Sequence, residues 1–113
     1  MKKSSKFYLV HIIDCINDIE KYTEGFSEIE FKDDPKTQDA VIRKLEIIGE
    51  AVKNIPEALK QEHPEISWKK ISGTRDVLIH EYFGVDIDIV WIVVIKDLPV
   101  LKRQTKKILE KIK

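Results

Sequence analysis

Residues 75–84 read Arg-Asp-Val-Leu-Ile-His-Glu-Tyr-Phe-Gly. The three aliphatic residues at the centre of this stretch predict a segment that packs into a core. Around them lie a permanent cation, a carboxylate, an imidazole and a phenol, contributed by Arg75, Asp76, His80 and Tyr82. Polar groups on such a segment are costly unless each one is satisfied or used. The stretch therefore predicts a central helix that carries a functional site.

The composition predicts one all-α domain around this helix. The chain has 113 residues, of which 42% are hydrophobic and 35% are charged, with only four Gly and four Pro. This length allows one sizeable core, and the low Gly and Pro content favours helix. Apolar residues recur at helical spacing, and no useful length of chain alternates as a strand would. We expect a single domain over residues 1–113, folded as an up-and-down bundle of four to five helices.

The apolar periodicity indicates where the helices lie. Long helices are expected at residues 5–23, at about 34–54, at 73–84 and from residue 86 onward. Short helical pieces are expected around 56–61 and 67–71, with the second piece separate from the central helix. Pro99 is expected to kink or restart the last helix, because proline cannot continue the backbone hydrogen-bond pattern.

Residues 24–34 gather acidic side chains and lose the helical periodicity, so they are expected to form a loop. The apolar residues in this loop are expected to fold back onto the core: Phe26, Ile29 and Phe31. Asp33 and Asp34 are neighbours in the chain, and neighbouring side chains diverge on any regular element. A solvated loop or a helix N-cap is therefore favoured over a metal site.

Two features of the second helix allow more than one interpretation. Gly49 in its interior is expected to mark a close helix crossing. Arg43, Glu46 and Glu50 share one face of this helix. They form either an exposed salt-bridge ladder or a polar face turned towards the central stretch.

The charge and cysteine content exclude several classes of protein. The formal net charge is zero, so any nucleic-acid contact must come from a local patch. The Lys-rich segment 102–113 is either a solvated face or a strip that contacts phosphates. Cys15, the single cysteine, cannot form an intramolecular disulfide and is expected to pack as a small apolar residue. The N-terminal segment does not resemble a signal peptide, and no apolar run is long enough to span a bilayer, so we expect a cytoplasmic protein.

Helical geometry relates the polar residues of the central stretch. Asp76 and His80 are four residues apart and therefore adjacent on a helix, so the carboxylate can orient the imidazole. Arg75 and His80 are five residues apart, which separates them by roughly 140° around the axis. One straight helix does not bring both to a single substrate atom. Either the helix bends, or a second copy of the chain supplies the partner residue across a two-fold axis.

The residue types in this stretch suit a particular chemistry. Arginine presents a bidentate fork for phosphate and keeps its charge, and histidine moves protons near neutral pH. Together they fit cleavage of RNA without a metal, because the 2′-hydroxyl of RNA is an internal nucleophile. The other interpretation is a helix whose Arg75 and His80 only form buried salt bridges.

The spacing Arg75-x4-His80-x-Tyr82 resembles the R-x4-H-x-Y signature of HEPN-domain proteins of the HepT type. These proteins are the toxin halves of MNT–HEPN (MntA–HepT) toxin–antitoxin systems, which form type VII. The similarity covers roughly residues 5–110, and further segments stand in the expected order. These segments are Ile-Gly-Glu-Ala at 48–51, Ile-Ser-Trp at 66–68, Gly-Thr-Arg-Asp at 73–76, Tyr-Phe-Gly-Val-Asp at 82–86, Val-Trp at 90–91 and Leu-Pro-Val-Leu at 98–101.

This resemblance implies a HEPN fold that forms a homodimer, with two motifs lining a cleft between the protomers. It implies a metal-independent endoribonuclease toxin that cleaves RNA by 2′-hydroxyl attack, with Arg75 and His80 as the catalytic pair. Asp76 would support them; the family often has Asn there, and the carboxylate puts a negative charge beside the phosphate site. Tyr82 matches the tyrosine that the partner nucleotidyltransferase modifies with AMP, which silences the toxin.

The resemblance also implies the partners. These are an RNA substrate, the MntA-like nucleotidyltransferase antitoxin and a second copy of the chain, with higher assembly left open. No metal, cofactor or membrane is expected. The alternative is a non-catalytic subunit that binds nucleotide or phosphate and serves as the partner of a nucleotidyltransferase.

Overall fold

The structure, a computed structural model, describes the backbone of residues 4–80 and 86–112. It describes the side chains of the same residues except 75–80. The described chain is helical and contains no strand, so the all-α prediction is confirmed. The elements are α1 (Ser5–Tyr22), α2 (Glu28–Lys32), α3 (Pro35–Lys53), α4 (Glu57–Glu62), α5 (Trp68–His80), α6 (Ile87–Ile92), the π-helical segment η1 (Val93–Asp97) and α7 (Leu98–Ile112).

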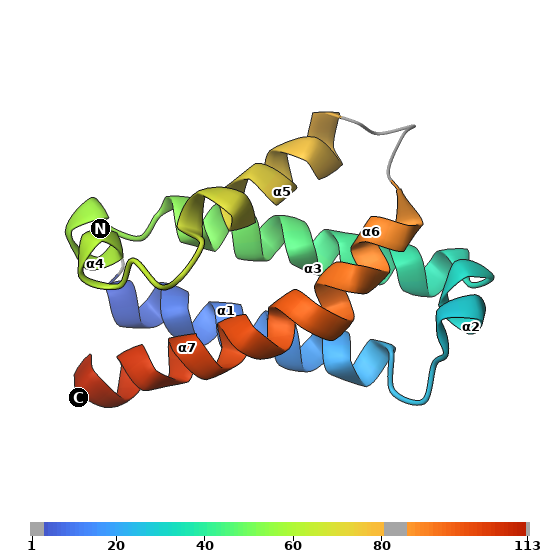
Figure 1. Ribbon diagram of the computed structural model, residues 1–113, viewed down its shortest axis with the longest axis horizontal. Coiled ribbons are helices and arrows are strands. Elements are labelled where there is room, and N and C mark those ends of the chain that lie inside the picture. Colours follow the sequence, from blue (N-terminus) through green and yellow to red (C-terminus); the bar gives the residue numbers. More distant parts are fainter. Residues whose placement is uncertain (1–3, 81–85, 113) are drawn as a thin grey trace.

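The long helices form a bundle with α3 at its centre. Helix α3 packs against α1 on one side and against α5 on the other, and α7 packs along α1 (Figure 1). The elements α6, η1 and α7 follow one another without a gap and together make one long helical arm. The short helices α2 and α4 lie at opposite ends of α3 (Figure 1). The core is mostly aliphatic, and its fully buried members include Leu9, Ile12, Ile16, Ile19, Val41, Val52 and Ile108.

Capping side chains set the starts of the long helices where the sequence predicts them. Ser4 accepts a hydrogen bond from the backbone N–H of Phe7 and so caps α1. Asp34 does the same for α3 by accepting from the N–H of Thr37 at 3.1 Å. Gly25 ends the turn after α1 with a φ of 77°, a conformation that glycine adopts without a Cβ clash. The N-cap interpretation of Asp34 is therefore confirmed.

The prediction of a loop over residues 24–34 is wrong, because this segment contains helix α2. Ser27 and Glu30 form a reciprocal capping box, in which each side chain accepts from the backbone N–H of the other residue. Phe31 is fully buried and lies against Trp91, with ring centroids 5.1 Å apart, as expected of a residue that folds onto the core. Ile29 is 73% exposed, so the same expectation is wrong for this residue.

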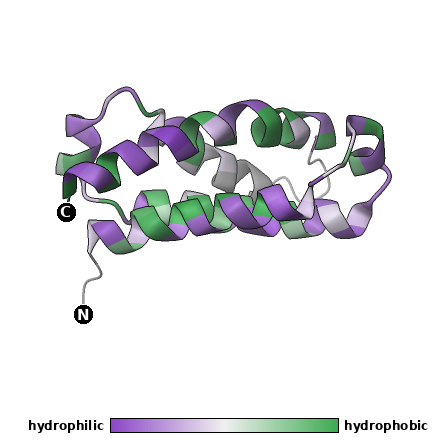
Figure 2. Cartoon of the chain, turned by 90° about the horizontal axis from the view of Figure 1, so that it is seen from below, coloured by the Kyte–Doolittle hydropathy of each residue, from purple (hydrophilic) through white to green (hydrophobic). Residues whose placement is uncertain are grey.

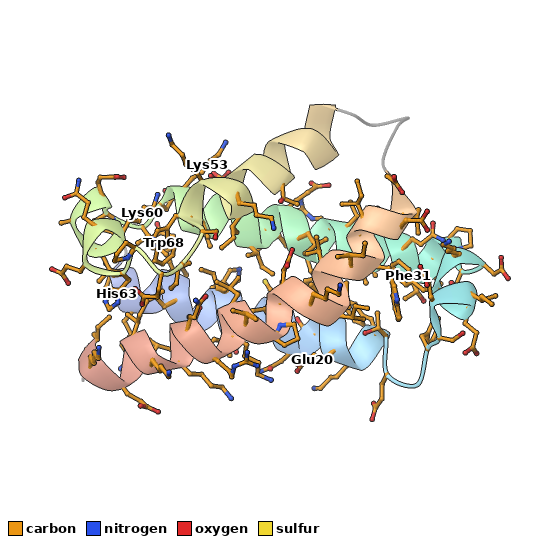
Figure 3. The ribbon with its side chains drawn as sticks, viewed as in Figure 1. Glu20, Phe31, Lys53, Lys60, His63 and Trp68 are labelled. Atoms are coloured by element: carbon orange, nitrogen blue, oxygen red, sulfur yellow. The ribbon has the colours of Figure 1, made fainter. Side chains whose placement is uncertain are left out.

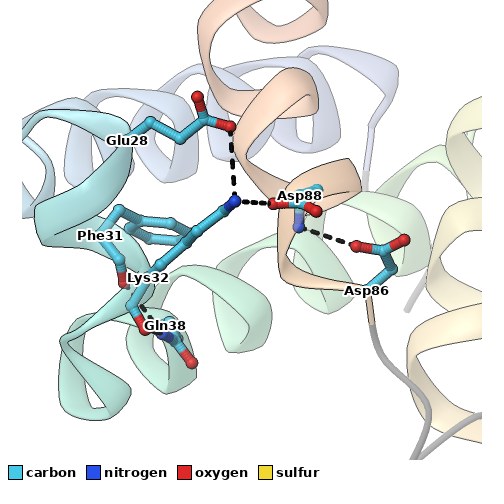
Figure 4. Close-up of polar contacts among 6 residues, drawn as sticks. All are labelled: Glu28, Phe31, Lys32, Gln38, Asp86 and Asp88. Carbon is cyan, nitrogen blue, oxygen red and sulfur yellow. Dashed lines mark hydrogen bonds and ion pairs between the residues drawn. The ribbon is translucent and has the colours of Figure 1, made fainter.

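Polar contacts attach α2 to its neighbours (Figure 4). The ammonium of Lys32 forms ion pairs with Glu28 on its own helix and with Asp88 on α6. The hydrogen bond to Asp88 raises the pKa of Lys32 above its usual value. The side-chain amide of Gln38 donates to the carbonyl oxygens of Phe31 and Lys32, both at 2.9 Å. Helix α2 is thus held by contacts to α3 and α6.

Helix α5 is one continuous helix, so the prediction of two separate pieces over this segment is wrong. Gly73, which suggested the break, lies inside it. The cost of an interior glycine, roughly 1 kcal/mol against alanine, is small enough for packing against α3 to override. Gly49 is buried on α3, which packs against α1 and α5. That it marks a close helix crossing stays a prediction.

The last helical arm begins at Asp86, as predicted. Its backbone hydrogen-bond pattern changes from α-helical to π-helical before Pro99. The carboxylate of Asp86 accepts from the N–H of Asp88 at 2.9 Å (Figure 4). The N–H of Leu98 donates to the carbonyl of Val93, five residues back, which is the π-helical pattern. Pro99 has no N–H, and the chain returns to α-helical geometry at the residue before it. The predicted restart near this proline is therefore confirmed.

Hydrophobic and hydrophilic residues are interleaved along the helices (Figure 2). Accordingly, none of the helices in the described part of the chain is long and apolar enough to cross a membrane.

Candidate active site on helix α5

The start of helix α5 is fixed by a buried tryptophan. The indole N–H of Trp68 donates to the carbonyl oxygens of Lys60, at 3.2 Å, and of His63, at 2.9 Å. These contacts join the first turn of α5 to the end of α4 (Figure 3). The backbone of Ile71 then donates to the carbonyl of Ser67, which starts the helical hydrogen-bond ladder. The helix that carries the predicted motif therefore begins at a well-anchored point.

The three predicted motif residues Arg75, Asp76 and His80 lie on the backbone of this helix, which runs without interruption to His80. Their side chains lie outside the described residues, and Tyr82 lies outside them altogether. The continuous helix gives Asp76 and His80 the i, i+4 relation on one face. It gives Arg75 and His80 the wide angular separation on which the expectation of a second copy depends.

A cavity of about 180 Å³ lies beside the first half of α5. It is bounded by α3, α5 and the arm formed by η1 and α7. Its walls are mostly aliphatic, and the residues that form them include Leu45, Ile48, Ile71, Val93, Leu98 and Leu101. Such a cavity suits one apolar ring or side chain, because an engineered cavity of about 150 Å³ holds benzene.

The rim of this cavity is polar. Lys70 on α5 forms an ion pair with Asp97 on η1, with 3.6 Å between ammonium nitrogen and carboxylate oxygen. The hydroxyl of Thr74 donates to the carbonyl of Lys70 at 2.9 Å. The amide of Gln104 on α7 donates to the carbonyl of Glu65 at 3.2 Å. The cavity thus combines an apolar interior with hydrogen-bonding groups of both kinds at its mouth.

This cavity is absent from the predictions made from the sequence. Its walls come from three parts of the structure that are far apart in the chain. None of these segments has a sequence pattern that indicates a cavity. The one local signal is the spacing of Lys70, Ile71 and Thr74, which places two polar groups and one apolar group on a single face of α5.

The other histidines and the cysteine are in surroundings that suit structural roles. His11 is exposed and stacks on Phe7, with ring centroids 6.1 Å apart. His63 lies 3.4 Å from the carboxylate of Glu65 in the turn before α5. Cys15 is buried, as predicted, and desolvation by that burial raises the pKa of its thiol. Among the described residues, no cluster of three or more His, Cys, Asp or Glu side chains is arranged to hold a metal ion.

The polar face of α3 contains an ion pair of the kind expected in a salt-bridge ladder. The guanidinium of Arg43 lies 3.7 Å from the carboxylate of Glu46, which is the first rung of a ladder. Glu46 is only half-buried, whereas Arg43 is well exposed. The helix neighbours α5, but the side chains of the motif lie outside the described residues. Whether this face turns towards them stays a prediction.

The basic tail lies on helix α7. Lys102 forms an ion pair with Glu20 on α1 at 2.8 Å, so this cation helps to hold the two helices together. Arg103, Lys106 and Lys107 are exposed. They lie on the face opposite the buried residues Leu101, Thr105 and Ile108. The tail therefore combines one structural cation with an exposed basic face.

Comparison with known proteins relates the whole chain to a single family. The family model described as HepT-like, ribonuclease HepT-like, matches residues 12–108. A protein of Thermococcus cleftensis named probable ribonuclease HepT is 50% identical over 96% of this chain and 98% of its own length. A putative RNase of Caldanaerobacter subterraneus is 44% identical over 96% of this chain and 97% of its own length.

A third relative is longer. A protein of Methanocaldococcus jannaschii, named gamma-glutamylcyclotransferase and putative RNase, is 46% identical over 99% of this chain, which spans 50% of that protein's length. No solved structure matches the chain significantly. The family match covers most of the chain and includes the helix that carries Arg75 and His80. The chain therefore belongs to the HepT-like ribonuclease family.

Proposed function

We propose that this protein is a metal-independent endoribonuclease whose catalytic pair is Arg75 and His80. The observation that carries the proposal is the family match over residues 12–108, with relatives named as ribonucleases over nearly their full length. The intact Arg75-x4-His80 spacing on one continuous helix supports it further. Asp76, one turn before His80, orients the imidazole.

The reaction needs no group beyond the chain and the RNA. The 2′-oxygen attacks the adjacent phosphorus and loses its proton, while the bond from phosphorus to the 5′-oxygen breaks and that oxygen gains a proton. His80 moves a proton, and Arg75 holds the phosphoryl oxygens as their negative charge increases. The products are a 2′,3′-cyclic phosphate and a 5′-hydroxyl.

The active unit in this proposal is a homodimer in which Arg75 of one copy and His80 of the other complete each site. Support comes from the wide angle between the two residues on one helix. Further support comes from apolar side chains that α6 and η1 leave exposed: Ile89, Ile92 and Ile95. Clusters of exposed apolar residues commonly mark protein interfaces.

Mixing two inactive variants tests this arrangement. The variants Arg75→Ala and His80→Ala are each expected to be inactive as purified dimers. After subunit exchange, mixed dimers contain one intact site, so about a quarter of the wild-type activity should return if the pair forms across the axis. If both residues act within one chain, no mixed dimer contains an intact site, and activity stays absent.

We further propose that this protein is the toxin of a type VII toxin–antitoxin pair, controlled at Tyr82. A nucleotidyltransferase antitoxin would transfer AMP from ATP to the phenol. The phenolic oxygen forms a bond to the α-phosphorus, the bond to the β-phosphate breaks, and pyrophosphate and a proton are released. The added bulk and negative charge would repel RNA from the site.

Incubation with a minimal nucleotidyltransferase and ATP tests this regulation. The expected result is a mass increase of one AMP on the wild type, with loss of cleavage, and no increase on Tyr82→Phe. Inhibition by complex formation alone, with no change in mass, would overturn it. A non-catalytic subunit that only binds phosphate predicts no cleavage by the wild type in any of these assays.

A further inference from the structure

We propose that the cavity between α3, α5 and the η1–α7 arm binds one nucleobase of the RNA, next to the phosphate that is cleaved. This inference rests on the ribonuclease function proposed above. It assigns a substrate subsite to residues that the catalytic motif does not include.

The position of the cavity on α5 is the first argument. Its α5 wall consists of Lys70, Ile71 and Thr74. Thr74 directly precedes Arg75, and consecutive Cα atoms are about 3.8 Å apart. The cavity wall and the catalytic motif are therefore neighbours on one continuous helix, so a strand that reaches the motif passes close to the cavity mouth.

The size and the walls of the cavity are the second argument. A volume of about 180 Å³ accepts one or two fused rings but excludes a helix or an extended peptide. Aliphatic side chains from three elements, including Leu45, Ile71 and Leu101, surround this space. Unstacked bases are commonly held between apolar side chains, which cover the two faces of the ring.

The polar rim is the third argument. A base has a hydrogen-bonding edge as well as apolar faces. The carboxylate of Asp97 accepts hydrogen bonds, the ammonium of Lys70 donates them, and the amide of Gln104 and the hydroxyl of Thr74 can do both. The Lys70 cation at this mouth also attracts the phosphates on either side of the base. An apolar side chain from another protein would fill the interior but make no hydrogen bond to this rim.

An abasic scan tests the proposal. Short RNA oligonucleotides each lack one base near the cleaved bond and are otherwise identical. At one position next to that bond, removal of the base should raise KM about tenfold or more, because a held base contributes that much to binding. An equal KM for every oligonucleotide of the series would overturn the proposal.

A variant with a larger side chain in the cavity tests whether the rise in KM on removal of a base arises at this site. Val100 lines the cavity and is 42% exposed, whereas Val10 on α1 is 39% exposed and lies elsewhere. Val100→Phe should raise KM for the intact oligonucleotide to that of the abasic one. Val10→Phe, the matched control, should behave as the wild type. An unchanged KM in Val100→Phe would overturn the assignment.

Direct binding separates this proposal from the ribonuclease function. In the His80→Ala variant, methyl NMR signals of Ile48 and Ile71 should shift with adenosine 5′-monophosphate and not with ribose 5-phosphate. If the wild type cleaves no RNA but these methyls shift, the cavity binds a base and the ribonuclease proposal fails. Absence of a shift overturns the base site. Conversion of dimers to monomers by Val100→Phe also overturns it, since the cavity would then belong to the subunit interface.

Discussion

The ammonium of Lys70 lies 3.6 Å from the carboxylate of Asp97, so the first half of α5 is tied to the π-helical segment η1. Helix α5 packs chiefly on α3, and this ion pair links it across the cavity to the last helical arm. Both side chains are substantially exposed to solvent. The pair therefore positions the two walls of the cavity without adding much to global stability.

Removal of this ion pair should have a small effect on folding. Asp97→Asn is expected to lower the free energy of unfolding by at most about 1 kcal/mol, because exposed pairs are weakened by solvent and salt. Urea denaturation at low and at high salt measures it, and the difference from wild type should shrink at high salt. The double variant Lys70→Asp with Asp97→Lys should restore the stability. A loss of several kcal/mol that salt does not reduce would contradict this assignment.

Truncation of Phe31 should be far more damaging. Its ring is fully buried and joins α2 to Trp91 on α6, so Phe31→Ala leaves a cavity and removes a large buried surface. The expected loss is about 3–5 kcal/mol in the free energy of unfolding, measured by urea denaturation. Ile29→Ala on the same helix is the matched control and should cost less than about 0.5 kcal/mol, since Ile29 is mostly exposed. Similar losses in the two variants would show that α2 is not docked through Phe31.

Gly73→Ala should stabilise the protein. Gly73 lies in the interior of α5, and a Cβ added there meets no atom within 4 Å. Alanine restricts the unfolded chain and favours the helix, so the free energy of unfolding should rise by about 0.5–1 kcal/mol. Thermal or urea denaturation measures the change. A destabilised variant would mean that the residue meets another surface, such as a second copy of the chain.

The capping box of α2 should make part of the stability depend on pH. Hydrogen bonds from the backbone and side chain of Ser27 lower the pKa of Glu30 below its usual value. The stabilisation from the ionised Glu30 is therefore present above the unfolded-state pKa and is lost as the pH falls through the lower pKa of the folded state. Glu30→Gln lacks this contribution. The difference in urea midpoint between wild type and Glu30→Gln should be measurable at pH 7 and smaller at pH 3, which lies below the usual glutamate pKa. An equal difference at both pH values would contradict the capping role.

Much of the fold could be predicted because its signals are local. Ser4, Asp34 and Asp86 each stand before a run of apolar residues at helical spacing, and each one caps a helix. Helix α2 was missed because five residues are too few to show periodicity. Its remaining signal was the Ser27-x-x-Glu30 capping box. The continuity of α5 was missed because Gly73 suggested a break, and only packing against α3 outweighs the cost of a glycine inside a helix.

The candidate site could be predicted only where its residues are close together in the chain. Arg75, Asp76 and His80 lie within a motif of six residues, so the sequence alone shows their spacing. The cavity joins Leu45 on α3 to Leu101 on α7, and nothing in either segment indicates that they meet. A contact of this kind depends on the tertiary arrangement of the helices.

The central claim is that RNA supplies its own nucleophile at a site that needs no metal. The most direct test uses one RNA oligonucleotide in excess EDTA, with the cut position mapped first. A second oligonucleotide then carries a single 2′-deoxy sugar at the nucleotide 5′ of that bond. The wild type should cut the first, leaving a 2′,3′-cyclic phosphate, and leave the same bond in the second intact, while His80→Ala cuts neither. Cleavage of the deoxy-substituted bond, or cleavage that requires an added divalent metal ion, would contradict the account.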